Sequence, residues 1–380
     1  MTVPALSRPA LNPVEPAGAI RALESALSGG PAVAPLPDHP TQAERAIQVL
    51  RPDVPLDADD IAAVVCTSGS TGEPKGVLLS RRAILASVEA THHRLGGRGR
   101  WLLALPIHYV AGLMVAARSL FSGSDPLDVG ADLDGLRRPR PRRGATRHYL
   151  SIVPTQLVRA LTDAELTDAL GRLDAVLVGG GPAGPDLIDR ARAASINVVT
   201  TYGMSETCGG CVYDGVPLDG VDVSIADDGR VSLGGSMLFS GYRLRPDLTE
   251  QTLTGRRLHT FDRGRIVGRR LEVLGRTDDV VVTGGLNVDL AAVEALIRAG
   301  STDEVVVLGV PDRQWGTKII AVTDRVCDLD ALVRSAGGQL GAYARPRALI
   351  RLEAFPRTGS GKIDRPTLRA MIIDQAIGPE

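Results

Sequence analysis

Short apolar runs alternate with helical segments between residues 61 and 203, and this alternation constrains the fold of the chain most strongly. Each run has the length of a buried strand rather than of a buried helix, and the runs are 61–66, 101–106, 148–154, 174–181 and 196–203. Helices are expected between them, with Ser80 and Thr155 as N-caps of two of these helices. Strands that alternate with helices predict an α/β core with parallel sheets.

The two ends of the chain have different patterns. Residues 1–60 are rich in Pro and Asp, with one helical stretch expected at about 40–50. Beyond about residue 220, short strands and hairpin turns predict a small β-rich subdomain. The last hundred or so residues read as a small α+β domain. We therefore expect an N-terminal domain over 1–277 and a C-terminal domain over 278–380.

Length and composition narrow the class of protein. A chain of 380 residues is too long for one ordinary core. A net charge of −1 gives no bulk attraction to nucleic acid or to acidic membranes. The N-terminus, MTVPALSRPALNPVEP, has no apolar segment typical of a signal peptide. Four cysteines are too few for a disulfide scaffold, so a cytoplasmic enzyme is expected.

Lysine is scarce in this chain. Lys and Arg together number 43, yet only Lys75, Lys318 and Lys362 are lysines. Because arginine serves wherever a generic positive charge is enough, a retained lysine indicates a need for a compact, mobile ammonium. Lys75 and Lys362 lie in stretches rich in Gly, Ser and Thr, although chance placement is the alternative. For Lys318 a surface role is expected.

The stretch TSGSTGEPKG, residues 67–76, has the composition of a phosphate-binding loop. It is not a Walker A loop, because that motif requires a Lys-Ser or Lys-Thr pair after its last Gly. It follows a predicted strand and precedes another strand or a helix, so its backbone N–H groups are free to bind an anion. A flexible surface loop is the alternative interpretation.

Four further stretches accompany this loop: PIHYVAG (106–112), TYGMSETCGG (201–210), GRTDDVVVTGGLNV (275–288) and PRTGSGKIDR (356–365). In this order, from about residue 60 to 370, the five stretches resemble the signature motifs of the adenylate-forming superfamily. That superfamily contains acyl-CoA synthetases, peptide-synthetase adenylation domains and luciferases. Within it, SIVPTQLVRAL, VLVGGGP and YGMSETCGGCVYDG are most similar to the o-succinylbenzoate–CoA ligases of menaquinone synthesis.

The resemblance implies an ATP-dependent acid–CoA ligase that uses ATP, Mg²⁺ and coenzyme A. A carboxylate attacks the α-phosphate of ATP, and the coenzyme A thiol then displaces AMP from the acyl-AMP. The partner is a small-molecule acid, with no nucleic acid and no membrane insertion; a homodimer is one option. The alternatives are a ligase for another aromatic or acyl acid, an enzyme that loads a carrier protein, and an inactive adenylate-binding protein.

The resemblance also assigns roles at the nucleotide. The β- and γ-phosphates are assigned to Thr67, Ser68, Gly69, Ser70, Thr71, Gly72 and Lys75. The adenine is assigned to Gly179, Gly180, Gly181 and Tyr202. Asp262 is expected to bind the ribose with help from Arg276, although Phe261 stands where the family usually has Gly. Glu206 is expected to ligate Mg²⁺, after Ser205 in place of the usual Thr.

Two roles belong to the C-terminal domain, which the resemblance implies is mobile. Lys362 is expected to bridge the attacking carboxylate and the α-phosphate, where charge builds in the transition state. Asp278 matches the hinge about which that domain rotates between the half-reactions, although a capping Asp is the alternative.

The acid itself is assigned to residues of the N-terminal domain. His108 is expected in the acyl pocket or thiol tunnel, with a structural role equally open. Gly203, Thr155 and Arg159 are placed at the substrate, and Arg159 is expected to meet the second carboxylate of o-succinylbenzoate unless it simply faces solvent. The pair Cys208 and Cys211 is expected to pack rather than to bind metal.

Overall fold

The computed structural model describes residues 10–56, 58–67, 74–138, 146–299, 304–326, 328–335, 341–357 and 363–377. The chain forms two compact units. Unit 1 comprises Met1–Val223, Leu233–His259 and Gly268–Leu271, and unit 2 comprises Ser224–Ser232, Thr260–Val267 and Glu272–Glu380. The expected domain boundary at residues 277/278 stays a prediction. No helix in the described ranges is long and apolar enough to cross a membrane.

The helices are α1 Pro16–Leu27, α2 Pro40–Leu50, α3 Arg81–Arg94, α4 Val110–Phe121, α5 Pro154–Ala160, α6 Ala164–Gly171, α7 Pro185–Ala193, α8 Pro246–Thr252, α9 Leu290–Ala299, α10 Leu329–Ser335 and α11 Arg365–Ile377. The short 3₁₀ turns are η1 Asp134–Arg137, η2 Ser205–Thr207, η3 Thr277–Asp279 and η4 Ala342–Ala344.

The strands are β1 Leu11–Val14, β2 Ala32–Pro35, β3 Ile61–Thr67, β4 Lys75–Ser80, β5 Gly99–Leu103, β6 Leu127–Asp128, β7 Arg147–Ile152, β8 Ala175–Gly179, β9 Val198–Met204, β10 Gly209–Tyr213, β11 Val216–Pro217, β12 Val221–Ile225, β13 Arg230–Gly235, β14 Gly241–Tyr242, β15 Leu253–Thr254, β16 Arg257–Val267, β17 Arg270–Arg276, β18 Val280–Thr283, β19 Leu286–Asp289, β20 Val305–Asp312, β21 Gly316–Thr323 and β22 Leu349–Arg351.

Two sheets form the centre of unit 1. The larger has the order β11-β10-β9-β8-β7-β5-β6, and its strands β5 to β9 run parallel. The other has the order β1-β2-β3-β4-β14, and both β4 and β14 run antiparallel to their neighbours. The predicted α/β fold is therefore confirmed, with parallel strands in the larger sheet and a mixed smaller sheet.

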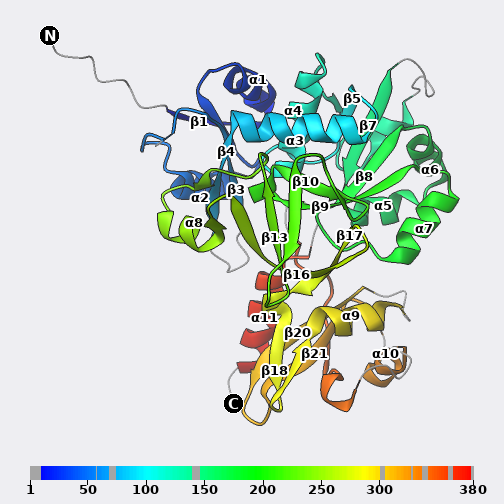
Figure 1. Cartoon of the computed structure of the whole chain (residues 1–380). Coiled ribbons are helices and arrows are strands. Elements are labelled where there is room, and N and C mark those ends of the chain that lie inside the picture. Colours follow the sequence, from blue (N-terminus) through cyan, green and yellow to red (C-terminus); the bar gives the residue numbers. More distant parts are fainter. Residues whose placement is uncertain are drawn as a thin grey trace. The chain divides into compact units, whose positions relative to one another are not determined.

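Helices α3 and α4 pack against each other between these sheets (Figure 1). Helix α3 contacts β3 and β4 of one sheet and β10 of the other, while α4 contacts β5, β7 and β10. Eight consecutive residues of α4, Gly112 to Ser119, are buried, as expected for a helix that is covered on every side. The predicted cap of α3 is confirmed, because Ser80 Oγ accepts a hydrogen bond of 3.1 Å from the Ala83 N–H.

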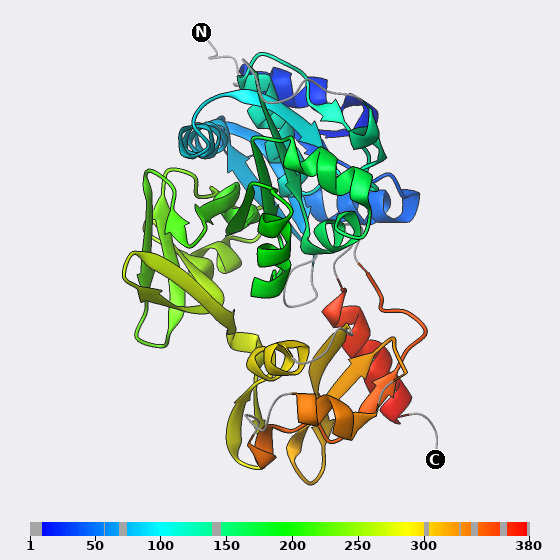
Figure 2. The ribbon, with the colours of Figure 1, turned by 90° about the vertical axis from the view of Figure 1, so that its right-hand side faces the viewer.

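The C-terminal part of unit 2 is a three-stranded sheet, β20-β21-β22, covered on both faces. Alternate residues of β20 point to opposite faces. Val305 and Val307 join a core with α9, whereas Val306 and Leu308 join a core with α11. Figure 2 shows the red helix α11 and the yellow helix α9 on either side of these orange strands. The predicted α+β character of this region is confirmed.

Two local expectations were wrong. Helix α5 begins at Pro154 and its N-cap is Val153, so Thr155 lies inside the helix. Proline is well suited to the first helical position, and Gln156 Oε1 accepts a 3.0 Å hydrogen bond from the Val153 N–H in place of the expected threonine cap. In addition, the first 60 residues contain β1, α1 and β2 besides the expected helix α2.

Candidate active site

The phosphate-loop stretch joins two antiparallel strands. Thr67 of β3 pairs with Lys75 of β4, and Cys66 pairs with Gly76. Gly76 is needed for packing here, because a Cβ at this position would lie 2.8 Å from Leu50 Cδ2 and 2.9 Å from Arg243 Cβ. The predicted ligands Ser68, Gly69, Ser70, Thr71 and Gly72 lie outside the described residues. The strand pairing brings the two ends of the stretch, Thr67 and Lys75, together.

Lys75, Glu206 and Tyr242 form a three-way contact in unit 1. Lys75 Nζ donates to Tyr242 Oη at 2.8 Å and lies 3.2 Å from Glu206 Oε1. Tyr242 Oη donates in turn to Glu206 Oε1 at 2.7 Å. Glu206 Oε2 accepts no hydrogen bond from any residue that the structure describes. Tyr242 thus contacts both Lys75, which was predicted to bind the phosphates, and Glu206, which was predicted to bind the metal.

Glu206 is held by the turn that follows strand β9. The turn η2, Ser205–Thr207, ends at Cys208, which adopts the left-handed conformation with φ of 50°. The fully buried Thr207 closes this turn, because its Oγ1 accepts from the Met204 N–H at 2.9 Å and lies 2.6 Å from the Gly209 carbonyl oxygen. The local backbone therefore fixes the direction of the Glu206 side chain.

No motif or periodic pattern in the sequence indicated Tyr242. It lies in SGYRL, far along the chain from the other two residues, and only the pairing of β14 with β4 brings it near Lys75. Tyr242 is buried, and burial together with the Glu206 carboxylate raises its pKa. The phenol therefore keeps its proton and can donate it in a hydrogen bond to Glu206.

The residues predicted to flank the adenine lie at the ends of β8 and β9. A Cβ on Gly179 would lie 2.1 Å from Thr201 Oγ1, and Gly180 has φ of +77°. Gly203 has the same constraint, because a Cβ there would lie 2.1 Å from the Gly209 carbonyl oxygen. Tyr202 and Ser205 are half-buried. Atoms of the adjacent strands therefore leave no room for a Cβ at Gly179 or Gly203, whereas Gly181 has open space beside it.

The predicted ribose and hinge residues meet within unit 2. Arg276 forms a bidentate ion pair with Asp278, with Nε 2.8 Å from Oδ1 and Nη2 2.9 Å from Oδ2. Arg276 Nη1 also lies 3.5 Å from Asp262 Oδ1, and its guanidinium covers the Phe261 ring at 5.9 Å. Lys362 lies outside the described residues.

The predicted substrate residues have unlike surroundings. His108 is buried, neither ring nitrogen has a partner among the described residues, and burial lowers its pKa. Thr155 and Arg159 are exposed. Arg159 Nη2 donates to the Ala131 carbonyl oxygen at 2.8 Å, which leaves its other N–H groups accessible. Arg159 is therefore anchored at one end and open at the other.

Three further residues that the sequence analysis singled out are Cys208, Cys211 and Lys318. Cys208 and Cys211 are buried, and burial raises the pKa of both thiols, that of Cys211 to about 12. The described residues contain no group of three or more His, Cys, Asp or Glu that could hold a metal ion, and both thiols belong to the packed interior. Lys318 is half-buried and pairs with Val310 across β20 and β21.

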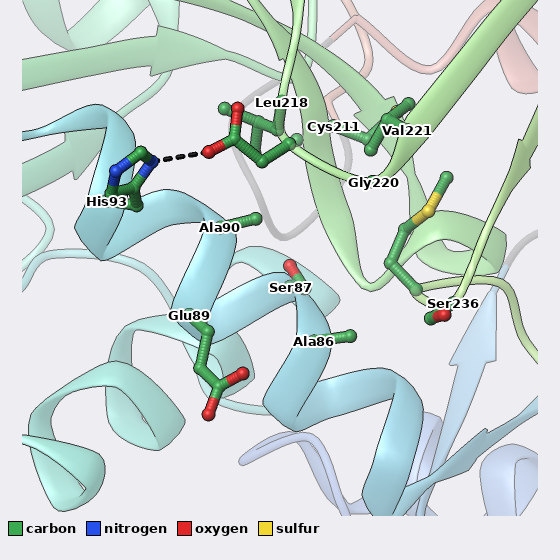
Figure 3. A pocket seen from close by; sticks show the side chains of 13 residues that line it. Ala86, Ser87, Glu89, Ala90, His93, Cys211, Leu218, Gly220, Val221 and Ser236 are labelled. Atoms are coloured by element: carbon green, nitrogen blue, oxygen red, sulfur yellow. Dashed lines mark hydrogen bonds and ion pairs between the residues drawn. The ribbon is translucent and has the colours of Figure 1, made fainter.

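A cavity of about 400 Å³ lies between α3 and the segment around β10 to β12 (Figure 3). Figure 3 shows Ala86, Ser87 and Ala90 along the α3 wall and His93 at one end of it. The His93 ring forms a hydrogen bond with Asp219. None of the residues predicted for nucleotide or acid lines this cavity. It is distinct from the contact of Lys75, Tyr242 and Glu206.

Comparison with known proteins establishes the family. The model of the AMP-binding enzymes matches residues 6–243, and that of the AMP-binding enzyme C-terminal domain matches residues 294–362. The chain belongs to the AMP-binding enzymes. The resemblance to the adenylate-forming superfamily is thereby confirmed.

One relative of this AMP-binding enzyme is the probable 2-succinylbenzoate–CoA ligase of Mycobacterium tuberculosis. The two are 44% identical over 342 residues, which cover 87% of this chain and 89% of the relative. Among solved structures, ATP-bound MatB from Rhodopseudomonas palustris is 25% identical with a TM-score of 0.73, over 97% of this chain and 80% of that one. A variant of E. coli MenE with bound OSB-AMS, 23% identical, shares the fold with a TM-score of 0.76 over 98% and 89%.

Proposed function

We propose that this AMP-binding enzyme is an ATP-dependent 2-succinylbenzoate–CoA ligase of menaquinone biosynthesis. It joins the succinyl carboxylate to coenzyme A through an acyl-AMP, with release of pyrophosphate and AMP. The observation that carries the proposal is the 44% identity to the ligase of M. tuberculosis over nearly the whole of both chains. A second ligase of that name, from Enterococcus faecalis, is 29% identical over 81% of this chain. We place the enzyme in the cytoplasm, where ATP and coenzyme A are available.

The donor set around Glu206 fits Mg²⁺. A carboxylate oxygen is the kind of ligand that this hard cation prefers, and Mg²⁺ commonly takes one or two carboxylates together with substrate phosphates rather than a protein cage. Glu206 supplies one such oxygen, since Oε2 accepts no hydrogen bond from the described residues. When bound, the ion would neutralise charge on the polyphosphate. Lys75, next to Glu206, would supply a second positive charge to the same phosphates.

The remaining roles rest on the motifs. Lys362 would stabilise the charge that builds between the attacking carboxylate and the α-phosphate. Asp262 would bind the ribose, with Arg276 fixing its carboxylate from 3.5 Å. Gly179 to Gly181 and Tyr202 would enclose the adenine. Asp278 would be the hinge of a C-terminal domain beginning at residue 278, and His108 would lie beside the acyl group.

Arg159 would meet the benzoate carboxylate that does not react. Its side chain is tied to the Ala131 carbonyl by one N–H and keeps the rest of its guanidinium accessible for a carboxylate. The acid 4-oxo-4-phenylbutanoate keeps the succinyl arm and lacks the ring carboxylate. We expect it to lose about tenfold or more in kcat/KM, which corresponds to roughly 1.4 kcal/mol for one charge-assisted contact.

The test compares both acids in three proteins. Arg159→Ala should lower kcat/KM far more for 2-succinylbenzoate than for the analogue. Arg172→Ala is the matched control, because Arg172 is also an exposed arginine but pairs with Asp168 on α6. Equal rates with the two acids in the unmutated enzyme would contradict the proposed substrate, and equal losses in Arg159→Ala would remove Arg159 from the acid site.

A further inference from the structure

The hydrogen-bond directions around Tyr242 follow from the chemistry of the three groups. A lysine ammonium has only donors, so the Tyr242 oxygen must accept the 2.8 Å bond from Lys75 Nζ. The phenol has a single proton, which is then free for the 2.7 Å bond to Glu206 Oε1. Both contacts on the carboxylate fall on Oε1, which leaves Oε2 without a described partner. The phenol thus determines which carboxylate oxygen is available.

Tyr242 is fixed much more firmly than Lys75. Its backbone N–H donates to Thr249 Oγ1 at 2.8 Å, and its ring packs edge-on against Phe239 at 4.9 Å. The next residue, Arg243, donates from its buried guanidinium to the carbonyl oxygens of Leu50, Arg51, Val54 and Pro55. Lys75, by contrast, is a long side chain at the first residue of β4. A change in this contact would therefore move the ammonium and leave the phenol in place.

We propose that Tyr242 is a positioning residue that orients Glu206 toward the metal-bound polyphosphate and holds Lys75 beside it until the nucleotide binds. Nucleotide binding then transfers the Lys75 ammonium from the carboxylate to the phosphates, while the phenol stays bonded to Oε1. This inference rests on the proposed function, because it assumes a nucleotide and Mg²⁺ at this site. Hydrogen-bond partners of a metal-ligating carboxylate typically contribute 10- to 100-fold to metal affinity.

The test measures binding rather than turnover. The probe is adenosine 5′-(α,β-methylene)triphosphate, which cannot release pyrophosphate from the α-phosphate. Its dissociation constant is measured by calorimetry with saturating Mg²⁺ and with EDTA, at one ionic strength and without acid or coenzyme A. The dissociation constant in EDTA divided by that in Mg²⁺ gives the contribution of the metal to binding. Tyr242→Phe should lower that ratio by roughly 10- to 100-fold.

Tyr213→Phe is the matched control. Tyr213 is also a buried tyrosine whose hydroxyl has a partner, Thr91 Oγ1 at 3.1 Å, but that pair lies apart from Lys75 and Glu206. This control should keep the ratio of the unmutated chain. The ratio should also be the same in Glu206→Gln and in the double variant Glu206→Gln/Tyr242→Phe, because the phenol acts only through the carboxylate.

The outcomes separate the two hypotheses. If the unmutated chain binds the probe equally well with and without Mg²⁺, the proposed use of the metal is wrong and the role of Tyr242 falls with it. If Mg²⁺ matters but Tyr242→Phe keeps the full ratio, the function stands and the positioning role is refuted. If Tyr242→Phe lowers the ratio equally in the unmutated chain and in the Glu206→Gln chain, the positioning role is also refuted, because the effect would then be a general loss of packing.

Discussion

His92 should lower the free energy of unfolding of unit 1 in mild acid. It is buried on α3, where its Nε2 accepts a 3.1 Å hydrogen bond from Trp101 Nε1. A second proton on this ring would lie near the buried Arg118, whose guanidinium is 5.0 Å from the Trp101 ring centroid. Burial, then Arg118, then Arg98 lower the pKa of His92 from 6.5 to about 4.

The sign follows from proton binding in the two states. Below pH 6.5 the unfolded chain binds a proton on this histidine, whereas the folded chain does not bind it until about pH 4. The free energy of unfolding therefore falls as the pH drops from 6.5 to 4 and is unaffected by His92 above this window. At about 1.4 kcal/mol per pH unit, the whole window has an upper bound of about 3 kcal/mol.

The assay is urea unfolding at pH 7 and pH 5, followed by tryptophan fluorescence. The chain has two tryptophans, so a Trp315→Phe background leaves Trp101 as the reporter beside His92. His92→Gln is the comparison, because its amide oxygen can still accept from Trp101 and it does not titrate. From pH 7 to 5 the histidine protein should lose about 2 kcal/mol more than the glutamine protein. Equal losses in both would refute the reasoning.

Two predictions concern the C-terminal region. Lys362→Ala should suppress formation of acyl-AMP, measured as pyrophosphate release, and leave conversion of preformed acyl-AMP to the thioester nearly intact; equal loss in both half-reactions would contradict its assigned role. Asp278→Pro fixes φ near −65° and should stop thioester formation while allowing a single turnover of pyrophosphate release. Asp278→Ala is the control, because it removes the same ion pair with Arg276 and keeps the backbone free to rotate. This variant should retain steady-state turnover. If it loses thioester formation as Asp278→Pro does, the effect belongs to the ion pair and not to the hinge.

The sequence predicted best where local pattern and tertiary environment agree. Strand β8 lies inside a parallel sheet that is covered on both faces, and it appears in the sequence as a continuous apolar run. The N-cap Ser80 was also predicted correctly, because a capping hydroxyl acts only on its own turn. Four-residue strands such as β1 and β2 carry no comparable period, so they were missed.

The candidate site was predictable in its motifs and not in its contacts. Lys75 and Glu206 each belong to a recognisable stretch, yet nothing in either stretch indicates that the two meet. Their meeting depends on Tyr242, whose strand β14 has two residues and no hydrophobic period. Long-range pairing of this kind is decided by the folded chain as a whole. The same limit applied to Arg243, which appeared in the sequence as one arginine among many.

Strand β14 also imposes an order on folding during synthesis. It completes the sheet of β1 to β4, but it follows β4 by about 160 residues. At about 5–20 residues per second, a ribosome needs on the order of 10–30 s to make that interval. Throughout it, the edge of β4 displays unpaired backbone groups to which another nascent chain can pair. A chaperone that shields this edge should therefore raise the yield of folded enzyme more than one that acts after release.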